Sequence, residues 1–407
     1  MDQPRSFNPT PFAYHEEVEL TIQTLNNHGA GLGRIDNWVV VVPFTLPGER
    51  VRGRIFRNHK NYSEADLVEV IEPSPDRIEP RCPLFTECGG CQYQHLDYPA
   101  QLQWKQRQIV ELMEHLGGIT HPVEPTHSSP RPFHYRSKLT PHYPSPREDK
   151  TLPIGFLRQG QRRRLIDVPQ CPIATESINQ ALPAERERLR AGAAKLKRGG
   201  TLLLRDTREG VITDNTAIVT ETLGKLLFQF PAGEFFQNNP FILPELVDYT
   251  LEQAADSETD YLIDAYCGVG MFALAGASRF KQVAGVEVNA AATRWANANI
   301  ALNRINNVEF IVGKAEAIFA EIDFPGDRTA MIIDPPRAGC DQAFLDQLIA
   351  FGPRRLVYVS CGPDTQARDL KILLAANYQL ERIQPFDLFP QTRHIESVAT
   401  LRKKEAH

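Results

Sequence analysis

Apolar and polar residues alternate along the N-terminal part of the chain. The alternation falls into four short segments separated by turns, at residues 18–22, 38–42, 51–55 and 65–71. A period of two is typical of β-strands that bury one face, and closely spaced short strands indicate a barrel or sandwich. We therefore expect a small OB-like β-barrel over residues 15–73, preceded by a flexible polar tail over residues 1–14.

The pattern changes after about residue 240. Apolar runs of strand length begin at Tyr261, Gln282, Met331 and Leu356, and helix-like stretches lie between them. Strands that alternate with helices predict a parallel sheet with helices on its faces. We expect an α/β domain over residues 237–407.

Residues 74–236 differ from both flanking regions and form a predicted central domain that is irregular at first and β-rich later. A helix is expected over residues 99–116, because apolar residues recur on one side of that stretch. Pro99 precedes it and Gly117-Gly118 ends it, as is usual for helix boundaries. This helix is expected to pack on the C-terminal domain.

Composition and charge fit a soluble protein with one unevenly charged region. The 407 residues are 42% hydrophobic and carry a net charge of −5. The sequence contains no run of 18 apolar residues and no apolar leader, so a cytoplasmic protein is expected. Lys and Arg outnumber Asp and Glu in residues 131–210, while the reverse holds in residues 250–330. The basic region predicts contact with a polyanion, although a merely solvated face is equally compatible with the count.

Four cysteines have the spacing of a metal site. Cys82, Cys88 and Cys91 lie close together in a glycine-containing stretch, and Cys171 follows much later, before a proline. Structural zinc sites usually have two close pairs of cysteines, whereas three plus one is closer to iron–sulfur ligation. We expect a [4Fe–4S] cluster on these residues, with zinc or unligated cysteines as alternatives.

A glycine-rich turn follows the strand that begins at Tyr261. It includes Gly268 and Gly270, and Glu287 ends the next strand. Glycines let the backbone approach a ligand closely, and an acid at the second strand end can accept both ribose hydroxyls. An adenosine-containing ligand is predicted. Turn or capping chemistry is the alternative for Asp264 and Asp334.

Cys361 stands where the strand starting at Leu356 stops, before Gly362-Pro363. This places a thiol at the carboxyl edge of the predicted sheet, where open α/β folds bind ligands. A thiol there can attack a substrate carbon, although many buried cysteines serve only as small apolar residues. Asp334-Pro335-Pro336-Arg337 ends a neighbouring strand with a rigid floor for a flat substrate.

Several motifs occur together in one order. They are Phe235-Phe236-Gln237-Asn238-Asn239, residues 264–270, Asp334-Pro335-Pro336-Arg337-x-Gly339, Ser360-Cys361-x-Pro363-x-Thr365 and His394-Ile395-Glu396-Ser397-Val398. In these the chain resembles RNA uracil-C5 methyltransferases, and in its cysteines it resembles the iron–sulfur branch that modifies bacterial 23S rRNA. The barrel, through its length and its turn from His28 to Arg34, resembles a TRAM domain, an RNA-binding module. The resemblance implies a class I, Rossmann-like methyltransferase domain that uses S-adenosylmethionine.

The same resemblance implies roles for single residues. Cys361 would add to uracil C6 as the nucleophile, and Glu396 would remove the C5 proton. The implied cofactor-binding residues are Gln237, Tyr266, Gly268, Gly270, Met271, Glu287, Lys314 and Asp334, with Glu287 on the ribose. Met271 and Lys314 depart from the residue types usual in the family, so contacts through their backbone are the safer expectation there.

RNA would reach such a site with its target base flipped out of the stack. Aromatic and basic residues suited to hold RNA lie in one run, namely Arg131, Phe133, His134, Tyr135, Arg136 and Lys138, and a second candidate is Arg162-Arg163-Arg164. A monomer is expected. The alternatives are a tRNA 5-methyluridine methyltransferase, an amino-group methyltransferase and an iron–sulfur RNA-binding or redox-sensing protein without methyl transfer. The tRNA branch in bacteria typically lacks both the barrel and the cysteines.

Overall fold

The structure is a computed structural model that describes residues 4, 7–145, 152–161, 163–193, 196–313, 319 and 321–405. The chain divides into two compact units. The first comprises residues 1–104, 153–168 and 391–393, and the second comprises residues 105–152, 169–390 and 394–407. In the described ranges no helix has the length and apolar character that a membrane span needs.

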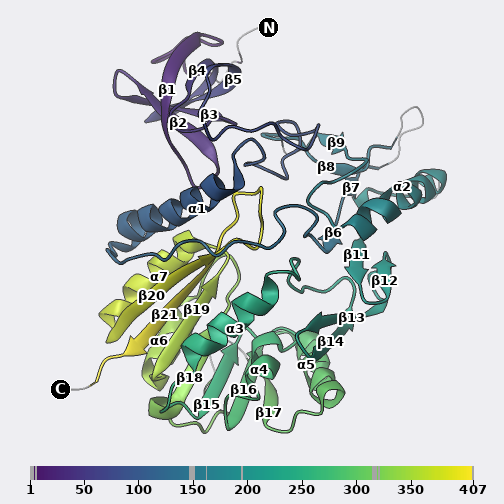
Figure 1. The fold of residues 1–407 in the computed structure, drawn as a ribbon, viewed down its shortest axis with the longest axis vertical. Helices are drawn as coiled ribbons and strands as arrows, with labels where there is room; N and C mark the ends of the chain where they lie inside the picture. Colours follow the sequence, from purple (N-terminus) through teal and green to yellow (C-terminus); the bar gives the residue numbers. More distant parts are fainter. Residues whose placement is uncertain are drawn as a thin grey trace. The chain divides into compact units, whose positions relative to one another are not determined.

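The first unit contains a closed five-stranded barrel, in the order β1-β2-β3-β5-β4 (Figure 1). Its strands are β1 (Glu17–Leu25), β2 (Ala30–Ile35), β3 (Trp38–Pro43), β4 (Arg50–Asn58) and β5 (Tyr62–Glu72). Exposed and buried residues alternate along β1, and the inward residues Leu20 and Ile22 join the barrel core. A Cβ at Gly33 would lie 2.6 Å from the carbonyl oxygen of Thr21, so β2 needs a glycine where it crosses β1. The predicted barrel is confirmed.

The second unit is built on a seven-stranded sheet in the order β17-β16-β15-β18-β19-β21-β20. Its strands are β15 (Tyr261–Ala265), β16 (Gln282–Glu287), β17 (Val308–Val312), β18 (Thr329–Ile333), β19 (Arg355–Ser360), β20 (Tyr378–Phe386) and β21 (Glu396–Lys403). The first five are parallel, and β21 runs antiparallel to both neighbours. The predicted Rossmann-like sheet is confirmed. Its strand order reverses between β15 and β18, which is where such sheets bind ligands.

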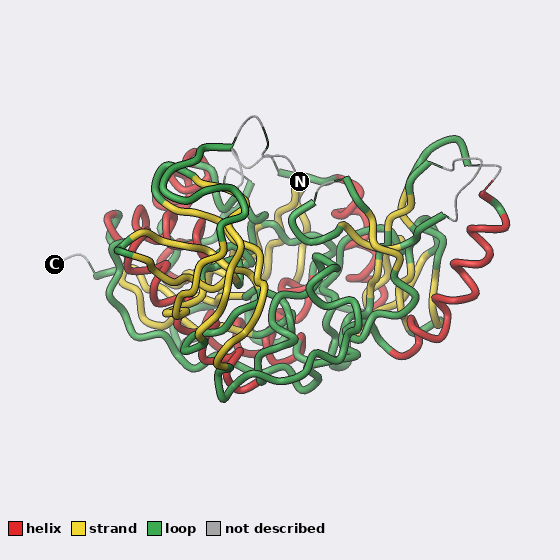
Figure 2. Tube along the Cα trace, turned by 90° about the horizontal axis from the view of Figure 1, so that it is seen from above, coloured by secondary structure: helices red, strands yellow, loops and turns green. Residues whose placement is uncertain are grey.

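Helices cover this sheet (Figures 1 and 2). They are α1 (Tyr98–Leu112), α3 (Leu243–Ala254), α4 (Met271–Gly276), α5 (Ala290–Asn303), α6 (Gln342–Phe351) and α7 (Pro363–Ala375). Successive residues of one strand enter different cores: Leu262 belongs to one buried cluster and Ile263 to another. Strands buried on both faces read as continuous apolar runs, which is the pattern seen in the sequence.

Short elements make up the rest of the described secondary structure. They are a π-helical turn (Met113–Gly117), α2 (Glu176–Ala191), a 3₁₀ turn (Gly326–Arg328), β6 (Lys138–Leu139), β7 (His142–Tyr143), β8 (Gly155–Leu157), β9 (Leu165–Asp167), β10 (Gly200–Thr201), β11 (Leu204–Thr207), β12 (Gly210–Ile212), β13 (Ile218–Leu223) and β14 (Leu226–Pro231). The helix expected over residues 99–116 thus begins one residue earlier as α1 and ends in the π-helical turn. Ile109 and Met113 from this stretch lie in the same buried cluster as Ile263.

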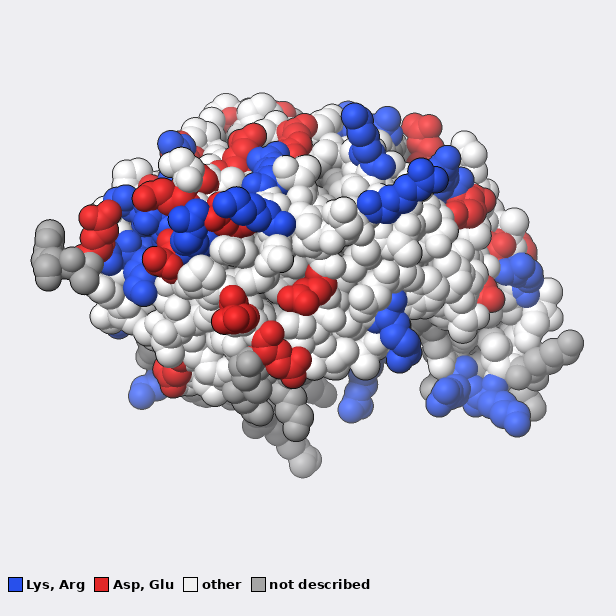
Figure 3. Space-filling model, turned by 90° about the horizontal axis from the view of Figure 1, so that it is seen from below, with Lys and Arg blue, Asp and Glu red and all other residues white. Residues whose placement is uncertain are grey.

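Charged residues gather at the amino ends of the parallel strands. Arg354 pairs with Glu258, while Lys281 and Arg328 both pair with Asp260. In the upper left of Figure 3, which views the molecule from below, Lys and Arg lie among Asp and Glu. Because opposite charges alternate there, this end of the sheet does not form a single-sign patch of the kind that attracts nucleic acid.

Helix α5 holds strand β14 through side-chain amides. The Asn299 amide donates to the carbonyl of Gln229 at 3.3 Å and accepts from its N–H at 2.8 Å. Asn303 makes the same pair of bonds with Leu227, at 2.7 and 2.9 Å. The two amides therefore take the place of a neighbouring strand along β14, and so fix the strand from which the chain enters residues 235–239.

We predict that Asn299→Leu destabilises the second unit by about 2–3 kcal/mol, because a leucine of similar size would leave the Gln229 N–H and carbonyl buried without partners. Denaturant unfolding of the full chain measures the change. Asn297→Leu is the matched control, since Asn297 is an exposed residue on the same helix. Equal effects of the two substitutions would contradict this account of β14.

Candidate active site

The pairing of the strands brings four predicted site residues to one edge of the second unit. Ala265 and Ile333 are neighbours at the ends of β15 and β18, so Tyr266 and Asp334 follow side by side. Ser360 pairs with Ser397, which continues the register so that Cys361 stands opposite Glu396. The edge thus combines the carboxyl ends of three parallel strands with the start of β21.

The glycine-rich turn after β15 has the backbone that its sequence predicted. Gly268 and Gly270 have φ values of 54° and 90°, and even Tyr266 has a φ of 65°. A Cβ at Gly270 would lie 2.5 Å from the ring of Phe310. The Asp264 carboxylate accepts from the N–H of Ala273 at 2.8 Å. Glycines therefore keep this turn free of side chains, and the Asp264 carboxylate connects the end of β15 to α4.

Glu287 lies at the end of β16 with its carboxylate over this turn. One oxygen accepts from the N–H of Gly268 at 3.0 Å and the other from the N–H of Asn289 at 2.8 Å. Each carboxylate oxygen can accept a second hydrogen bond. Glu287 is half-buried, so the arrangement fits the pair of ribose hydroxyls that the sequence predicted for it.

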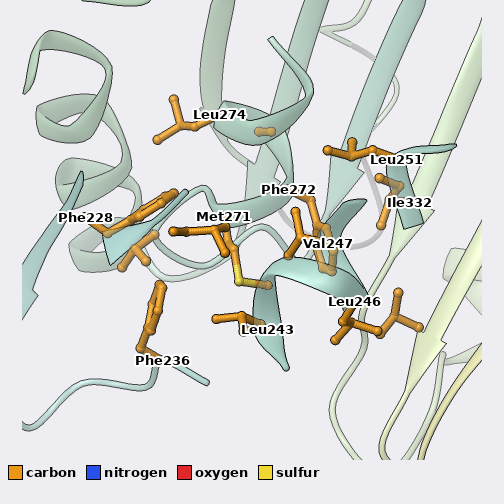
Figure 4. Close-up of a cluster of buried hydrophobic side chains, with 14 of the residues drawn as sticks. Phe228, Phe236, Leu243, Leu246, Val247, Leu251, Met271, Phe272, Leu274 and Ile332 are labelled. Atoms are coloured by element: carbon orange, nitrogen blue, oxygen red, sulfur yellow. The ribbon is translucent and has the colours of Figure 1, made fainter. Parts of the chain in front are cut away.

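Met271 and Gln237 have different surroundings. The Met271 side chain is buried among Phe228, Phe236 and Leu243 (Figure 4). It is therefore taken up by the core, and only its backbone remains for a ligand. Gln237 is half-buried, between Phe236, which stacks on Phe230, and the fully buried Asn239. Lys314 lies outside the described residues.

Acidic groups surround the thiol of Cys361, which is half-buried. Burial raises the pKa of Cys361 to about 11, with further increases from the negative charges of Glu396 and Asp334, while Arg337 opposes the change. These causes place both carboxyl groups within electrostatic reach of the sulfur. Burial and the two negative charges thus favour the protonated thiol.

The two carboxyl groups are themselves perturbed. Glu396 is only 2% exposed, and burial raises its pKa well above the usual value, with Asp334 adding to the increase. Burial also raises the pKa of Asp334 to about 7. A carboxyl group with a raised pKa is suited to accept and release a proton near neutral pH, and such shifts cluster at functional sites.

Asp369 on α7 orders the loop that begins at Asp334, and no motif in the sequence points to this residue. Its carboxylate accepts from the hydroxyl of Tyr358 at 2.8 Å and from the N–H of Cys340 at 2.9 Å. Arg368 donates to the same carboxylate and to the carbonyl of Cys340. The predicted floor of the site is thus fastened to the helix that follows Cys361.

The predicted RNA-binding run is in part wrong. Phe133 is 9% and Tyr135 0% exposed, so neither can stack on an RNA base. The Lys138 ammonium donates to the carbonyls of Gly233 and Glu234. Arg131 lies 3.9 Å from the ring centroid of Phe241. Most of the run is therefore engaged in the protein's own structure.

The remaining candidates in that region are polar. His134 and Arg136 are half-buried, Arg163 and Arg164 are exposed, and Arg162 lies outside the described residues. The sequence placed no weight on Phe235 as a separate aromatic contact, yet it is 71% exposed and lies two residues from Gln237. Exposure of a large aromatic next to a binding motif is the signal that only a structure reveals.

The arrangement of the cysteines does not support the predicted [4Fe–4S] cluster. Cys82, Cys88, Cys91 and Cys171 are each half-buried. Burial raises the pKa of the Cys82 and Cys88 thiols. Over the ranges that the structure describes, no three Cys, His, Asp or Glu side chains are grouped so that they could hold a metal ion.

Comparison with protein families gives two matches. The profile of the tRNA (uracil-5-)-methyltransferase family matches residues 201–404, and that of the TRAM domain matches residues 15–68. The chain is 43% identical to a Schizosaccharomyces pombe tRNA (uracil(54)-C(5))-methyltransferase, over 97% of this chain and 79% of the relative. Its identity to the Saccharomyces cerevisiae enzyme of that name is 33%, over 99% and 76% of the two chains.

A solved structure is similar over nearly the whole length. It is Pyrococcus abyssi tRNA (uracil-54, C5)-methyltransferase in complex with S-adenosyl-L-homocysteine, with a TM-score of 0.72 and 25% identity, covering 94% of this chain and all of that one. Together with the site geometry, these similarities show that the chain belongs to the tRNA (uracil-5-)-methyltransferase family and is an S-adenosylmethionine-dependent RNA uracil-C5 methyltransferase with an N-terminal TRAM domain.

Proposed function

We propose that this enzyme methylates C5 of the uridine at position 54 of tRNA. The observation that carries the proposal is the 43% identity to a relative named for that reaction. The sequence favoured 23S rRNA, because barrel and cysteines suggested that branch. The match to the S. pombe enzyme spans 97% of this chain and so includes the barrel, which therefore does not argue for rRNA. The tRNA alternative is favoured.

The first chemical step falls to Cys361. C5 of uracil is a weak nucleophile, and addition of the Cys361 thiolate to C6 converts the ring into an enolate with electron density on C5. The thiol proton must leave first. Glu396 and Asp334 both act electrostatically on Cys361 and are the carboxyl groups at hand to receive it.

Glu287 and the turn at Gly268 and Gly270 would hold the cofactor. S-adenosylmethionine, when bound, supplies the methyl group that C5 takes. Gln237 would contact both the cofactor and the target base, and Asp334 would lie between them. In the protein alone, Asp334 already lies beside Tyr266 at the strand ends, which supports this assignment.

Release of the product needs a base. After methylation C5 still carries its proton, and Glu396 would remove it. The electron pair of the C–H bond restores the C5–C6 double bond through the enolate, and the bond from C6 to the Cys361 sulfur breaks. Because Glu396 stands opposite Cys361 in the register of β19 and β21, it is well placed to act on the carbon next to the one attached to sulfur.

The target uridine must be flipped out of its stack for C5 and C6 to be reached. In the second unit, the exposed ring of Phe235 is a candidate contact for the RNA next to the target base, and the TRAM barrel is a separate candidate for binding RNA. On the barrel the arginines of β4 are paired: Arg50 bonds Glu19 and Glu72, and Arg52 bonds Glu19 and Glu69. Because these arginines are already paired, RNA binding by this face of the barrel would need other contacts besides unpaired positive charge.

We predict that the purified full-length protein transfers a labelled methyl group from S-adenosylmethionine to a tRNA transcript with uridine at position 54. A transcript with cytidine at that position, and a 23S rRNA transcript, should take up no label. Methylation of the rRNA alone would overturn the tRNA proposal while leaving the chemistry intact.

The variants Cys361→Ala and Glu396→Gln should fail at different steps. Without the thiol no covalent enzyme–RNA complex can form, whereas without the base a methylated complex forms and persists. Denaturing gel electrophoresis of enzyme with tRNA and S-adenosylmethionine distinguishes them. We expect both variants to lose at least about 1,000-fold in turnover, as is typical for a missing nucleophile or base. Normal methyl transfer by Cys361→Ala would refute covalent catalysis.

The pH dependence of thiol alkylation tests the charges around Cys361. Negative charge on Glu396 raises the pKa of the thiol, so Glu396→Gln should lower it and speed alkylation by iodoacetamide at mildly alkaline pH, since the thiolate is the reactive form. Mass spectrometry of the Cys361 peptide follows the reaction. Asp346→Asn, an exposed site on α6, is the control. An unchanged pH profile in Glu396→Gln would contradict the described electrostatics.

A further inference from the structure

The connection between β20 and β21, residues 387–395, is irregular yet buried. Asp387 and Leu388 are completely buried and Ile395 is 4% exposed. A buried segment without regular pairing must find other partners for its carbonyl groups, because a buried carbonyl without a hydrogen bond destabilises the fold. The source of those partners is therefore informative.

Buried side chains from separate parts of the second unit supply them. Asn239 donates to the carbonyl of Leu388 at 2.9 Å, and Tyr135 donates to that of Pro390 at 3.0 Å. Lys105 on α1 donates to the carbonyls of Phe389 at 3.2 Å and His394 at 3.0 Å. Lys105 thus binds this connection at two separate points, one near its start and one near its end.

Lys105 also places a buried positive charge against this connection. Its ammonium lies 2.6 Å from the carboxylate of Asp387, and both side chains are 0% exposed. An ammonium has three donors, and Asp387, Phe389 and His394 give it three acceptors. Burial lowers the pKa of Lys105, while the Asp387 carboxylate acts in the opposite direction. A buried charge held this completely restricts the groups around it.

The backbone segment that Lys105 holds leads directly to Glu396. Only Ile395 separates that residue from Glu396, the first residue of β21. Pairing with Phe386 on one side and the register with β19 on the other fix the strand itself. Lys105 fixes the backbone just before it. The backbone at Glu396 is thus restricted by strand pairing and, just before it, by Lys105.

We propose that Lys105, with Asp387, is a positioning residue for Glu396, and that it serves the proton-removal step in particular. The inference rests on the proposed function, in which Glu396 is the base. The ammonium of Lys105 binds acceptors in the β20–β21 connection, which leads to Glu396, while Asp334 remains available to receive the proton of the Cys361 thiol. Loss of Lys105 should therefore spare formation of the covalent complex and slow its breakdown.

The test is the share of enzyme trapped on RNA during turnover. Full-length Lys105→Gln is mixed with the tRNA transcript and S-adenosylmethionine, and the covalent complex is quantified on a denaturing gel. We expect turnover to fall about 10- to 100-fold, the loss that a small displacement of a catalytic group causes. The trapped share should rise as turnover falls, while the Kd for S-adenosylhomocysteine stays unchanged.

Gln106→Ala is the matched control on the same helix, because the Gln106 amide binds the carbonyl of Val123 instead. It should leave the trapped share at the wild-type level. Adding Cys361→Ala to Lys105→Gln should abolish the trapped complex. If Lys105→Gln does not fold, as judged by lost S-adenosylhomocysteine binding, Asp387→Asn is read by the same criterion, since it keeps the shape and removes the charge.

Two results would overturn the inference in distinguishable ways. If Lys105→Gln, or Asp387→Asn in its place, slows formation and breakdown together and leaves the trapped share unchanged, Lys105 is a structural residue only. If Glu396→Gln itself traps no complex, the assignment of the base in the proposed function fails, and the positioning role fails with it.

Discussion

The antiparallel pairing of β21 with β19 is the constraint on which the site depends. In a purely parallel sheet each strand contributes only its carboxyl end to the ligand edge. Because β21 runs the other way, its first residue reaches the same edge as the last residue of β19. Cys361 and Glu396 thus face each other from strands that the core holds on both sides. A nucleophile and a base can be kept in fixed register without any mobile loop between them.

That register has an electrostatic consequence. A thiolate and two carboxylates cannot all be charged in one half-buried site at little cost, since burial and like charge both favour the protonated forms. The raised pKa values of Cys361, Asp334 and Glu396 follow from this. Burial and like charge thus favour the protonated form of the Cys361 thiol.

Much of the fold could be predicted from the sequence, because the barrel and the parallel strands each have a clear hydrophobic period. Cys361 and Glu287 could be placed at strand ends for the same reason. The buried polar residues could not. Tyr135 was predicted to contact RNA and Lys105 was not singled out, since periodicity identifies apolar faces and carries no information on which polar side chain turns inward to meet a carbonyl. Met271 is the opposite case. It follows the glycine-rich turn and was predicted to bind the cofactor, but its side chain belongs to the core.

The buried polar residues have one property in common, which explains why they escape pattern analysis. Asn239, Tyr135 and Lys105 all bind carbonyls of the β20–β21 connection, and each comes from a part of the chain that reads as having another purpose. An apolar connection would be cheaper to bury, because a buried ion pair is rarely more stable than well-packed hydrophobic residues. What the polar contacts provide is direction, since hydrogen bonds to successive carbonyls fix the backbone where packing alone would let it shift. Such precision matters in the β20–β21 connection, because this segment leads to Glu396.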